Sequence, residues 1–377
     1  WDEFELREQF GSRIAFPGAN LRFSNDPQLL PAEVSSQFPD QIAGLRRLIA
    51  ELPDYDQLDL RAPRTSARAY LRRFLTEPLL VEMLLCPLMY YGNARETDMD
   101  VAQFCIMFRS IFLEGFARPR AGVRLILKKL VRRYKQLGGL LRLRAGVARL
   151  KTAGPNVVGV VLDDGQELSA KQILSSAGAV ETARLCSAAA PAPVAGGILS
   201  FVETISILDR PPASYGHAET IVFFNDAANF DWRRPAELVD VRSGVICSPN
   251  NFAYDAPLAE GIVRVTALAN FERWQALSPE RYQDAKQAWF AAVQQSAARF
   301  VPDCAPFTVA TDMFTPTTIR RFTGHDQGAV YGAPEKRYDG TTPFQNLFLC
   351  GTDQGYVGIV GALVSGIAMA NVHCLPR

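Results

Sequence analysis

The sequence predicts a mixed α/β fold (α/β with α+β character) in which two domains are interleaved along the chain. Three segments lead to this prediction. Residues 26–118 have the hydrophobic period of helices, and residues 197–271 contain consecutive β-rich runs that precede a long helix. Residues 346–370 combine a strand, a glycine-rich turn and an apolar helix. Because strands in a row with a helix behind them are typical of an antiparallel sheet, we expect one domain to be built on such a sheet.

The composition is that of a folded protein with no preference for polyanions. Hydrophobic residues make up 48% and charged residues 21% of the 377 positions, which excludes disorder and collagen-like repeats. Lys and Arg number 40 against 39 Asp and Glu, which leaves a formal net charge of +1. This balance gives no reason to expect nucleic-acid binding. The length allows two or three ordinary domains or one large interwoven unit.

Cysteine and histidine are too scattered to indicate a metal centre. The seven cysteines form no C-x-x-C pair, and His217, His325 and His373 lie far apart in the chain. We therefore predict no metal site, no disulfide framework and a reducing, cytoplasmic location. The chain begins at Trp1 without a signal peptide, and we interpret this start as that of a fragment.

The first third of the chain is expected to form a hairpin and then helices. Residues 13–23 alternate in polarity around Pro17-Gly18, which predicts two short strands and a turn. Helical periodicity follows to about residue 118. The apolar and aromatic runs at 70–91 and 104–116 are interpreted as core, with an apolar substrate tunnel as the alternative.

The clearest helix spans residues 119–137 and is both amphipathic and basic. Its apolar stripe consists of Val123, Ile126, Leu127, Leu130, Val131, Tyr134 and Leu137. Lys and Arg residues occupy most of the remaining positions, and Gly138-Gly139 ends the helix. A basic amphipathic helix can lie on an anionic membrane. We favour the other interpretation, in which the stripe packs against a core and the basic face is solvated.

Strands dominate the pattern from residue 140 to residue 314. Short strands are expected at 140–143, 157–162 and 172–175. The β-rich segments that follow are 199–208, 220–224, 244–248 and 262–268. A long helix at 279–300 and a strand at 307–314 complete this part.

The C-terminal segment carries the most chemical information. The strand Asn346–Cys350 leads into the glycine-rich run Gly351–Ala362, and no charged residue occurs from 354 to 372. That length raises the question of a transmembrane helix, but the glycines at the start of the run oppose a continuous helix. We predict a strand, a glycine-rich loop and a buried helix. Such a unit brings free backbone N–H groups close to a bound anion.

Two further blocks accompany this motif and carry a family resemblance. One block runs from Pro119 through the basic helix to Ala170–Gly178, and the other contains Thr315–Thr318 and Gly328–Gly332. Their order and spacing resemble those of flavin-dependent phytoene desaturases, carotenoid isomerases and retinol saturases, a branch of the amine-oxidase-like flavoprotein superfamily. The resemblance extends from about Phe10 to the end of the chain.

The resemblance implies an FAD-binding, Rossmann-like domain that is interleaved with a substrate domain. The substrate domain would comprise residues 1–117 and 191–330. The FAD domain would comprise residues 118–190 and 331–377. The antiparallel sheet and its helices then belong to the substrate domain.

The same resemblance implies positions for the cofactor. The backbone of Val147 would lie near the adenine, Asp353 near the ribityl or diphosphate group, and the turn Gly358–Ala362 at the flavin pyrimidine edge. The expected cofactor-binding residues are Val147, Gly351, Thr352, Asp353, Gly358, Ile359, Val360, Gly361 and Ala362. A helix N-terminus at this edge would stabilise the anionic reduced flavin. Tyr331, Gln354 and Tyr356 are expected to line the substrate, and no catalytic acid or base is assigned.

Several positions depart from the family pattern. Thr352 stands where most relatives have an acid, Val357-Gly358 replaces a common Pro-Gly, and Ala121-Gly122 replaces Gly-Gly. The sequence also contains no G-x-G-x-x-G fingerprint after a strand. We therefore expect the N-terminal dinucleotide-binding βαβ unit to be missing, so that a preceding segment or a partner chain completes the FAD site.

The function expected from this resemblance is FAD-dependent hydride transfer to or from a long apolar isoprenoid or polyene. The reaction would be desaturation, saturation or isomerisation of a carotenoid or retinoid. A flavin amine oxidase and a non-catalytic prenyl-binding protein on the same scaffold are the alternatives. The expected partners are an apolar small molecule and no nucleic acid, with peripheral membrane contact through residues 119–137 or 70–91.

Overall fold

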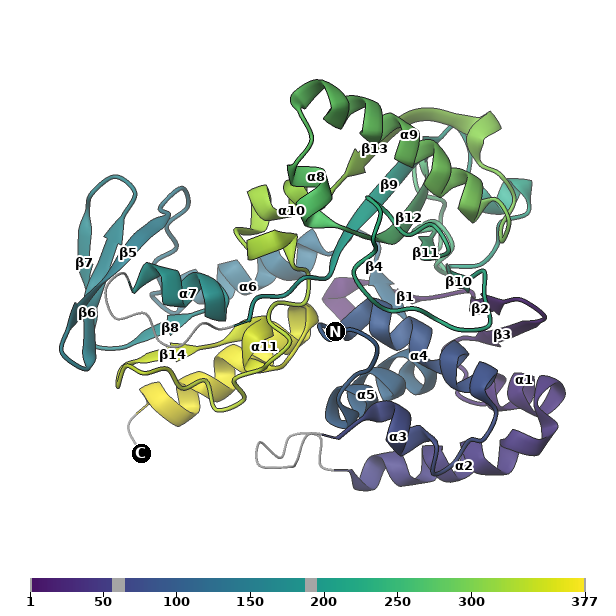
Figure 1. Ribbon diagram of the computed structural model, residues 1–377, viewed down its shortest axis with the longest axis horizontal. Coiled ribbons are helices and arrows are strands. Elements are labelled where there is room, and N and C mark those ends of the chain that lie inside the picture. The colour runs from purple at the N-terminus through teal and green to yellow at the C-terminus, as the bar shows by residue number, and fades with distance from the viewer. Residues whose placement is uncertain (1, 56–64, 187–194, 376–377) are drawn as a thin grey trace. The chain divides into compact units, whose positions relative to one another are not determined.

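The computed structural model describes residues 2–55, 65–186 and 195–375, and these residues form two units (Figure 1). The sheet unit comprises Trp1–Arg133 and Phe201–Thr315, and the motif unit comprises Tyr134–Ser200 and Pro316–Arg377. Helices, one large sheet and smaller sheets together make a mixed α/β fold, which confirms the predicted fold class. The four domain segments with boundaries after residues 117, 190 and 330 stay a prediction.

A seven-stranded sheet forms the centre of the sheet unit, in the order β13-β9-β12-β11-β10-β2-β3. Its strands are β2 (Ser12–Phe16), β3 (Ala19–Phe23), β9 (Ser200–Leu208), β10 (Ile221–Asn225), β11 (Ser243–Cys247), β12 (Gly261–Ala269) and β13 (Thr308–Phe314). The predicted hairpin is present, since β2 and β3 pair antiparallel around Gly18, whose φ is +78°. Strand β2 also pairs in parallel with β10, which joins the hairpin to a segment far along the chain.

The central strands β10 and β11 are buried on both faces of the sheet. Successive residues of a strand point to opposite sides of the sheet. Val222 and Phe224 of β10 belong to a core that also contains residues of helix α9 (Pro279–Ala297). Phe223 points the other way, and its ring centroid lies 5.0 Å from that of Tyr91 in helix α4 (Pro78–Gly92). Figure 1 shows α9 and α4 on opposite sides of the strands.

The helical segment consists of short helices that pack into the apolar core. They are α1 (Leu29–Gln37), α2 (Ile42–Glu51), α3 (Ala67–Leu71), α4 and α5 (Val101–Phe108), which continues as a π-helix over Arg109–Glu114. Most residues of α4 are buried. The rings of Phe104, Phe108 and Phe112 follow one another at centroid distances of 5.6 and 5.0 Å. The apolar runs therefore form core, as the favoured interpretation predicted.

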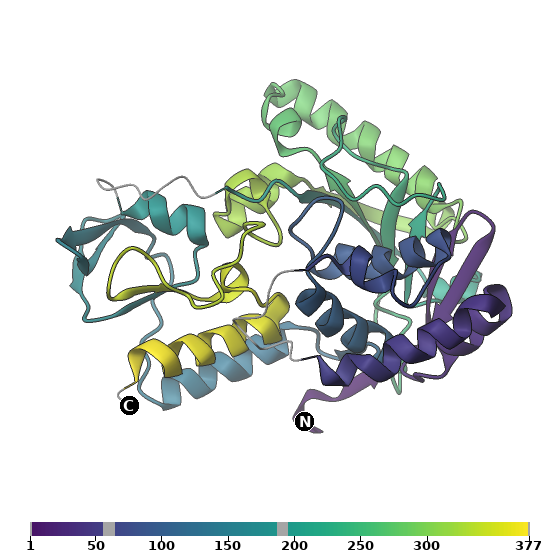
Figure 2. The same ribbon diagram turned by 60° about the horizontal axis from the view of Figure 1, so that its bottom comes forward.

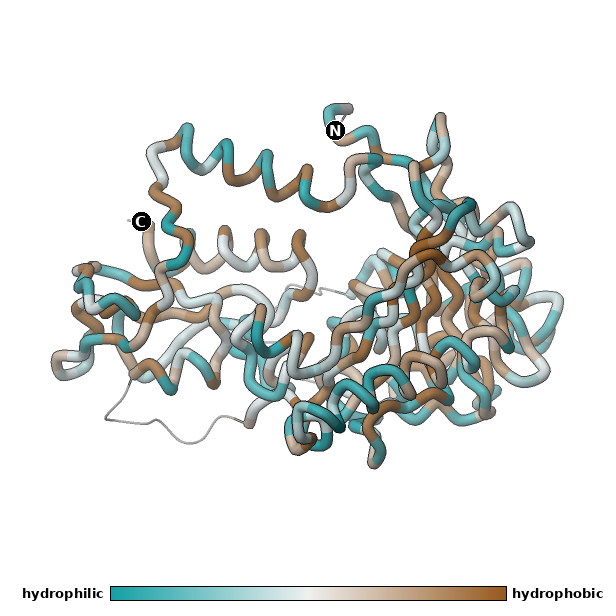
Figure 3. The backbone as a smooth tube through the Cα atoms, turned by 90° about the horizontal axis from the view of Figure 1, so that it is seen from above, coloured by the Kyte–Doolittle hydropathy of each residue, from teal (hydrophilic) through white to brown (hydrophobic). Residues whose placement is uncertain are grey.

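Helix α6 (Arg124–Gln136) confirms the predicted basic helix but not its predicted environment. None of its residues is buried, and apolar members of its stripe, among them Leu127 and Val131, are exposed. The interpretation that the stripe packs against a core is therefore wrong for the described residues. Figure 3 shows hydrophilic and hydrophobic residues alternating along this helix. Short strands β1 (Leu6–Glu8) and β4 (Ala117–Pro119) pair with each other before it.

The strand predicted at residues 140–143 is absent. This segment has no strand pairing among the described residues, and Leu140 and Leu143 are 84% and 77% exposed. Alternation of apolar and polar residues has the period of a strand, but a strand requires a partner for its backbone N–H and C=O groups. The prediction from local pattern fails here because the segment makes no such pairing.

The motif unit contains two small sheets and several helices (Figure 2). Strands β5 (Val147–Ala153), β6 (Asn156–Leu162) and β7 (Glu167–Ser169) form an antiparallel sheet. Strand β8 (Ile173–Ser175) pairs in parallel with β14 (Leu347–Leu349). The helices are α7 (Ala179–Leu185), α10 (Pro316–Thr323) and α11 (Gly358–Met369). Leu150, Val157, Phe344 and Leu347 belong to one buried apolar cluster of this unit.

Helix α11 follows the predicted strand and glycine-rich turn, but it is not the buried helix that was expected. Ser365 and Met369 are its buried residues, whereas Val360 is 72% exposed. Among the helices in the described ranges, none combines the length and apolar character needed to cross a bilayer.

Candidate functional site

The glycine-rich turn at the end of β14 is the centre of the candidate site. The backbone N–H of Cys350 donates to the carbonyl of Ser175, which keeps β14 beside β8 up to the turn. Gly351 then adopts a φ of +79°, a conformation that side-chain-bearing residues rarely adopt. Its N–H donates to the hydroxyl of Ser365, which is fully buried in α11, over 2.7 Å. The turn and the helix that follows it are therefore held together.

Asp353 links three segments of the motif unit. One carboxylate oxygen accepts a hydrogen bond from the N–H of Ala179, the first residue of α7, and the other accepts from the N–H of Ala333, each over 2.7 Å. Lys336 lies close to the same group, with its ammonium 3.6 Å from Oδ1. Asp353 is 3% exposed, so these bonds replace the water that a carboxylate requires.

Gly332 makes this arrangement possible. A Cβ built at Gly332 would lie 1.9 Å from Oδ1 of Asp353, and the backbone φ there is +67°. A side chain at this position would therefore displace the carboxylate from Ala333. The expected role of Asp353 near a ribityl or diphosphate group stays a prediction, and each carboxylate oxygen keeps a lone pair for a further donor.

The N-terminus of α11 presents backbone N–H groups without a side-chain cap. Val357 precedes the helix and provides no capping hydrogen bond. Gly358 has a φ of +76°, and a Cβ added to it would meet nothing within 4 Å. Gly361 is different, because a Cβ there would lie 2.9 Å from the backbone of Tyr356. The start of α11 is therefore open at Gly358 and closely packed at Gly361. Its free backbone N–H groups can bind an anionic or electron-rich group.

Gln354 adds a polar group to the base of the turn. Its side-chain amide donates to the carbonyl of Tyr338. Its Oε1 is buried and accepts no hydrogen bond from the residues that the structure describes. Tyr331 lies on the loop that Asp353 holds, and burial raises the pKa of its hydroxyl well above the usual value. Tyr331 is therefore a neutral group at physiological pH.

The predicted cofactor-binding residues fall into two groups. Gly351, Thr352, Asp353 and the run Gly358–Ala362 lie together on the turn and the first part of α11. Val147 begins β5 in the three-stranded sheet, where it pairs with Leu162. These positions stay predictions as cofactor contacts.

His325 and Asp326 do not form a relay with each other. His325 Nδ1 lies 3.7 Å from Oε1 of Glu181 in α7, and this carboxylate raises the pKa of the imidazole. Asp326 instead accepts from Arg184, which lowers the pKa of its carboxyl. The two pairs connect α7 to the loop after α10.

Sequence reasoning missed the groups that hold Asp353. Ala179 and Ala333 contribute backbone N–H groups, which no side-chain pattern reveals. Lys336 carried no distinct signal, since it stands between the charged residues Glu335 and Arg337, although its side chain is only 11% exposed.

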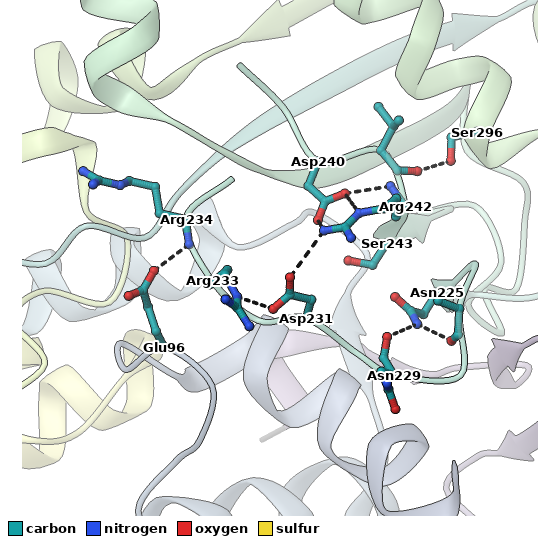
Figure 4. A network of polar contacts seen from close by, with 12 residues as sticks. Glu96, Asn225, Asn229, Asp231, Arg233, Arg234, Asp240, Arg242, Ser243 and Ser296 are labelled. Atoms are coloured by element: carbon teal, nitrogen blue, oxygen red, sulfur yellow. Dashed lines mark hydrogen bonds and ion pairs between the residues drawn. The ribbon is translucent and has the colours of Figure 1, made fainter. Parts of the chain in front are cut away.

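A second polar network lies in the sheet unit (Figure 4). Arg242 donates to both oxygens of Asp240 and lies 3.6 Å from Asp231, which also accepts from Arg233. The backbone N–H of Arg234 donates to Glu96. Every carboxylate drawn in this network has a partner, so we interpret it as a structural brace of the loop between β10 and β11.

The fold of the chain is similar to those of solved oxidoreductases. An oxidoreductase from Methanosarcina mazei has a TM-score of 0.63 at 13% identity, over 97% of this chain and 82% of that one. Cyclohexylamine oxidase from Brevibacterium oxydans has a TM-score of 0.59 at 13% identity, over 98% and 82%. A putrescine oxidase variant has a TM-score of 0.59 at 15% identity, over 98% and 83%. The chain shares the fold of these enzymes. At such identities the similarity concerns the fold alone.

Sequence similarity leads to a different set of proteins. The chain is 25% identical to the chloroplastic prolycopene isomerase of Arabidopsis thaliana over 325 residues, which are 81% of this chain and 53% of that protein. Prolycopene isomerase 1 of an Oncidium hybrid cultivar is 23% identical over 326 residues, 80% of this chain and 53% of that protein. The chain thus spans about half the length of the curated relatives it matches. No family model matches the chain.

Proposed function

We propose that this chain is part of an FAD-dependent oxidoreductase that acts on a long apolar isoprenoid or polyene. The observation that carries the proposal is the uncapped N-terminus of α11, joined to β14 by the turn that Ser365 and Asp353 hold. The shared fold with oxidoreductases and the similarity to prolycopene isomerases support it. The substrate class and the subtype belong to the proposal.

The residues of the turn fit an FAD molecule in two respects. Gly358 leaves open space at the start of α11, so a planar ring has room to approach the backbone. The buried Oε1 of Gln354 offers an acceptor that no described residue uses. Gly351, Thr352, Asp353 and Gly358–Ala362 would hold the cofactor, with Val147 at the adenine end. FAD supplies hydride transfer when it is bound.

The residues of this chain would position the cofactor and provide a favourable electrostatic environment for it. Partial positive charge at the start of α11 favours negative charge on a nearby ring, which stabilises a reduced cofactor. Besides its proposed contact with the cofactor, Asp353 accepts hydrogen bonds from Ala179 and Ala333 and so positions their backbone relative to the turn. Tyr331, Gln354 and Tyr356 are the proposed substrate-lining residues. Hydride transfer to or from a polyene requires an apolar site without water more than it requires an acid or base of the protein.

The first test is cofactor binding by the full natural gene product. Visible absorption after desalting with added FAD should show bound flavin, and Gly358→Val should reduce the bound fraction at least about tenfold by blocking the open entrance. Gly154→Val is the matched control, because Gly154 also has a positive φ and open space but lies in the β5–β6 turn. Absence of flavin from the unmodified protein would contradict the proposal.

Substrate assays separate the proposal from its alternatives. Anaerobic mixing of the flavin-loaded protein with a polyene should change the flavin spectrum or the isomer composition of the polyene. Bleaching by primary amines alone would favour an amine oxidase. Tight prenyl-lipid binding without flavin would favour a non-catalytic carrier.

A further inference from the structure

A partly enclosed cavity of about 400 Å³ lies in the motif unit. It is formed by one side of α7, strand β14 and the loop 337–344. Its described lining includes no residue of the turn Gly351–Ala362, but it adjoins that turn, because the backbone N–H groups of Ala179 and Arg337 donate to Asp353. The volume falls within the range of small-molecule sites.

The walls of this cavity are mainly apolar. Ala179 and Ala183 contribute from α7, Leu347 and Leu349 from β14, and Phe344 from the loop. Leu347, Leu349 and Phe344 are buried in the structure. An apolar chain of modest length would therefore find complementary surface inside.

Most polar groups in the lining are already bonded within the protein. The hydroxyl of Thr182 bonds to Ser175 over 2.6 Å, and that of Thr342 donates to the carbonyl of Leu347 over 2.7 Å. Cys186 donates to the carbonyl of Thr182, and burial raises the pKa of its thiol, so it remains uncharged at neutral pH. These hydroxyl and thiol groups therefore need no hydrogen bond from a ligand and carry no charge.

Arg337 is the exception. Among the described residues that line the cavity it alone is charged, and its guanidinium has no hydrogen-bond or ion-pair partner in the described part of the chain. Its backbone is held on both sides, since its N–H donates to the carbonyl of Asp353 and its carbonyl accepts from Gly340. The nearby Asp339 accepts from Thr341 instead. The backbone of Arg337 is thus held at the rim of the cavity, and its exposed guanidinium keeps its donors available for a ligand.

We propose that this cavity binds a small amphipathic carboxylate, such as a medium-chain fatty acid. The apolar chain lies against Ala183, Phe344 and Leu349, and the carboxylate accepts paired hydrogen bonds from Arg337. A guanidinium matches a carboxylate in both charge and geometry. A neutral lipid would leave the guanidinium without a partner, and a compact anion would leave the apolar walls unused. The proposal does not depend on the proposed oxidoreductase function.

Decanoate is the probe, and its binding is measured by isothermal titration calorimetry on the full protein. Arg337→Gln should weaken decanoate binding about tenfold, because it removes the charge and the paired hydrogen bonds to the carboxylate. Ala183→Leu should weaken it by a comparable factor, because it fills the cavity without changing charge. Arg142→Gln is the matched control, since Arg142 is exposed in the same unit and bonds to Gln166 outside the cavity. Circular dichroism verifies that each variant is folded.

The chain-length series decides the chemical class. Each methylene removed from decanoate should weaken binding about fourfold, the value expected for apolar burial. Acetate binding as tightly as decanoate, or equal decanoate affinity in all three variants, would overturn the proposal. Competition between FAD and decanoate would also overturn it, because the cavity would then belong to the cofactor. Failure of FAD to bind leaves the decanoate result unchanged, so the two proposals can fail separately.

Discussion

At the scale of single residues, buried polar groups lead to the most direct predictions of stability. His217 is fully buried in the sheet unit, and neither ring nitrogen has a hydrogen-bond partner among the described residues. Burial lowers its pKa to about 4, so the folded protein holds it neutral at physiological pH. In the unfolded chain the same imidazole takes up a proton near its ordinary pKa of 6.5.

This difference predicts a loss of stability on acidification. As the pH falls from about 6.5 towards 4, only the unfolded state gains a proton at His217, so the free energy of unfolding decreases by up to about 3 kcal/mol. Urea denaturation of the protein at pH 7 and pH 4.5 measures the decrease. His217→Asn should show a smaller decrease over the same interval. An identical pH dependence in the two proteins would show that His217 protonates equally in the folded and unfolded states.

The hydrogen bonds of Asp353 predict that its substitution lowers the stability of the protein. Asp353→Asn keeps one carbonyl oxygen but turns the other acceptor into a donor that faces an N–H group. The expected destabilisation is about 2 kcal/mol, measured as a lower midpoint in thermal or urea unfolding. Asp339→Asn is the control, because Asp339 is an exposed acid in the neighbouring loop. Equal effects of the two substitutions would argue against a positioning role for Asp353.

At the scale of elements, α6 is the feature that differs most from an ordinary core helix. Residues 115–162 contain no Asp or Glu, while the helix itself is rich in Lys and Arg and has exposed apolar residues. Leu137, Leu140 and Leu143, just after the helix, are also exposed. This combination of charge and apolar surface is typical of segments that lie on anionic membranes.

We expect the protein to bind vesicles that contain phosphatidylserine and to release them at high salt. The attraction is electrostatic and therefore screened by ions. The double variant Lys128→Glu and Arg132→Glu should weaken co-sedimentation at least about tenfold, since each basic residue near the surface contributes about 1 kcal/mol. Neutral phosphatidylcholine vesicles are the lipid control. Equal binding of the variant, or none by the unmodified protein, would exclude α6 as a membrane contact.

At the scale of the whole molecule, the fold depends on packing and hydrogen bonds, not on covalent links. All seven cysteines are free thiols in the structure. Burial raises the pKa of every one of these thiols, which makes them poor nucleophiles at neutral pH.

The thermal midpoint should therefore be the same in the presence and absence of a reductant. Differential scanning fluorimetry with and without dithiothreitol tests this expectation directly. A lower midpoint with dithiothreitol would reveal a disulfide that stabilises the native protein.

Local pattern predicted those elements whose formation depends on neighbours in sequence. The β2–β3 hairpin follows from Pro17-Gly18, and the strand β14 and its turn follow from an apolar run that ends in glycine. Long-range pairing was not predictable in the same way. The parallel pairing of β2 with β10 joins segments that are far apart in the chain, and no local signal specifies the partner.

The candidate site shows the same division. Its glycines stand out in the sequence because a turn with positive φ favours glycine. Asp353 stands out because it is an acid, buried in the structure, that precedes a long uncharged run. The bonds from Ala179 and Ala333 were invisible, since any residue except proline offers a backbone N–H. The exposure of α6 and α11 was also unpredictable, because an apolar stripe reveals what a helix can bury and not whether a neighbour covers it.

The amino-acid sequence by itself determined the mixed α/β class, the hairpin, the basic helix and the glycine-rich turn, because propensity, period and backbone freedom act over a few neighbouring residues. Only the tertiary structure decided the parallel β2–β10 pairing and the hydrogen bonds that hold Asp353. It also decided the burial of His217 without a hydrogen-bond partner among the described residues and the cavity that Arg337 lines. Each of these depends on which distant backbone or side-chain atoms come within a few ångströms, and that proximity is a property of the folded chain.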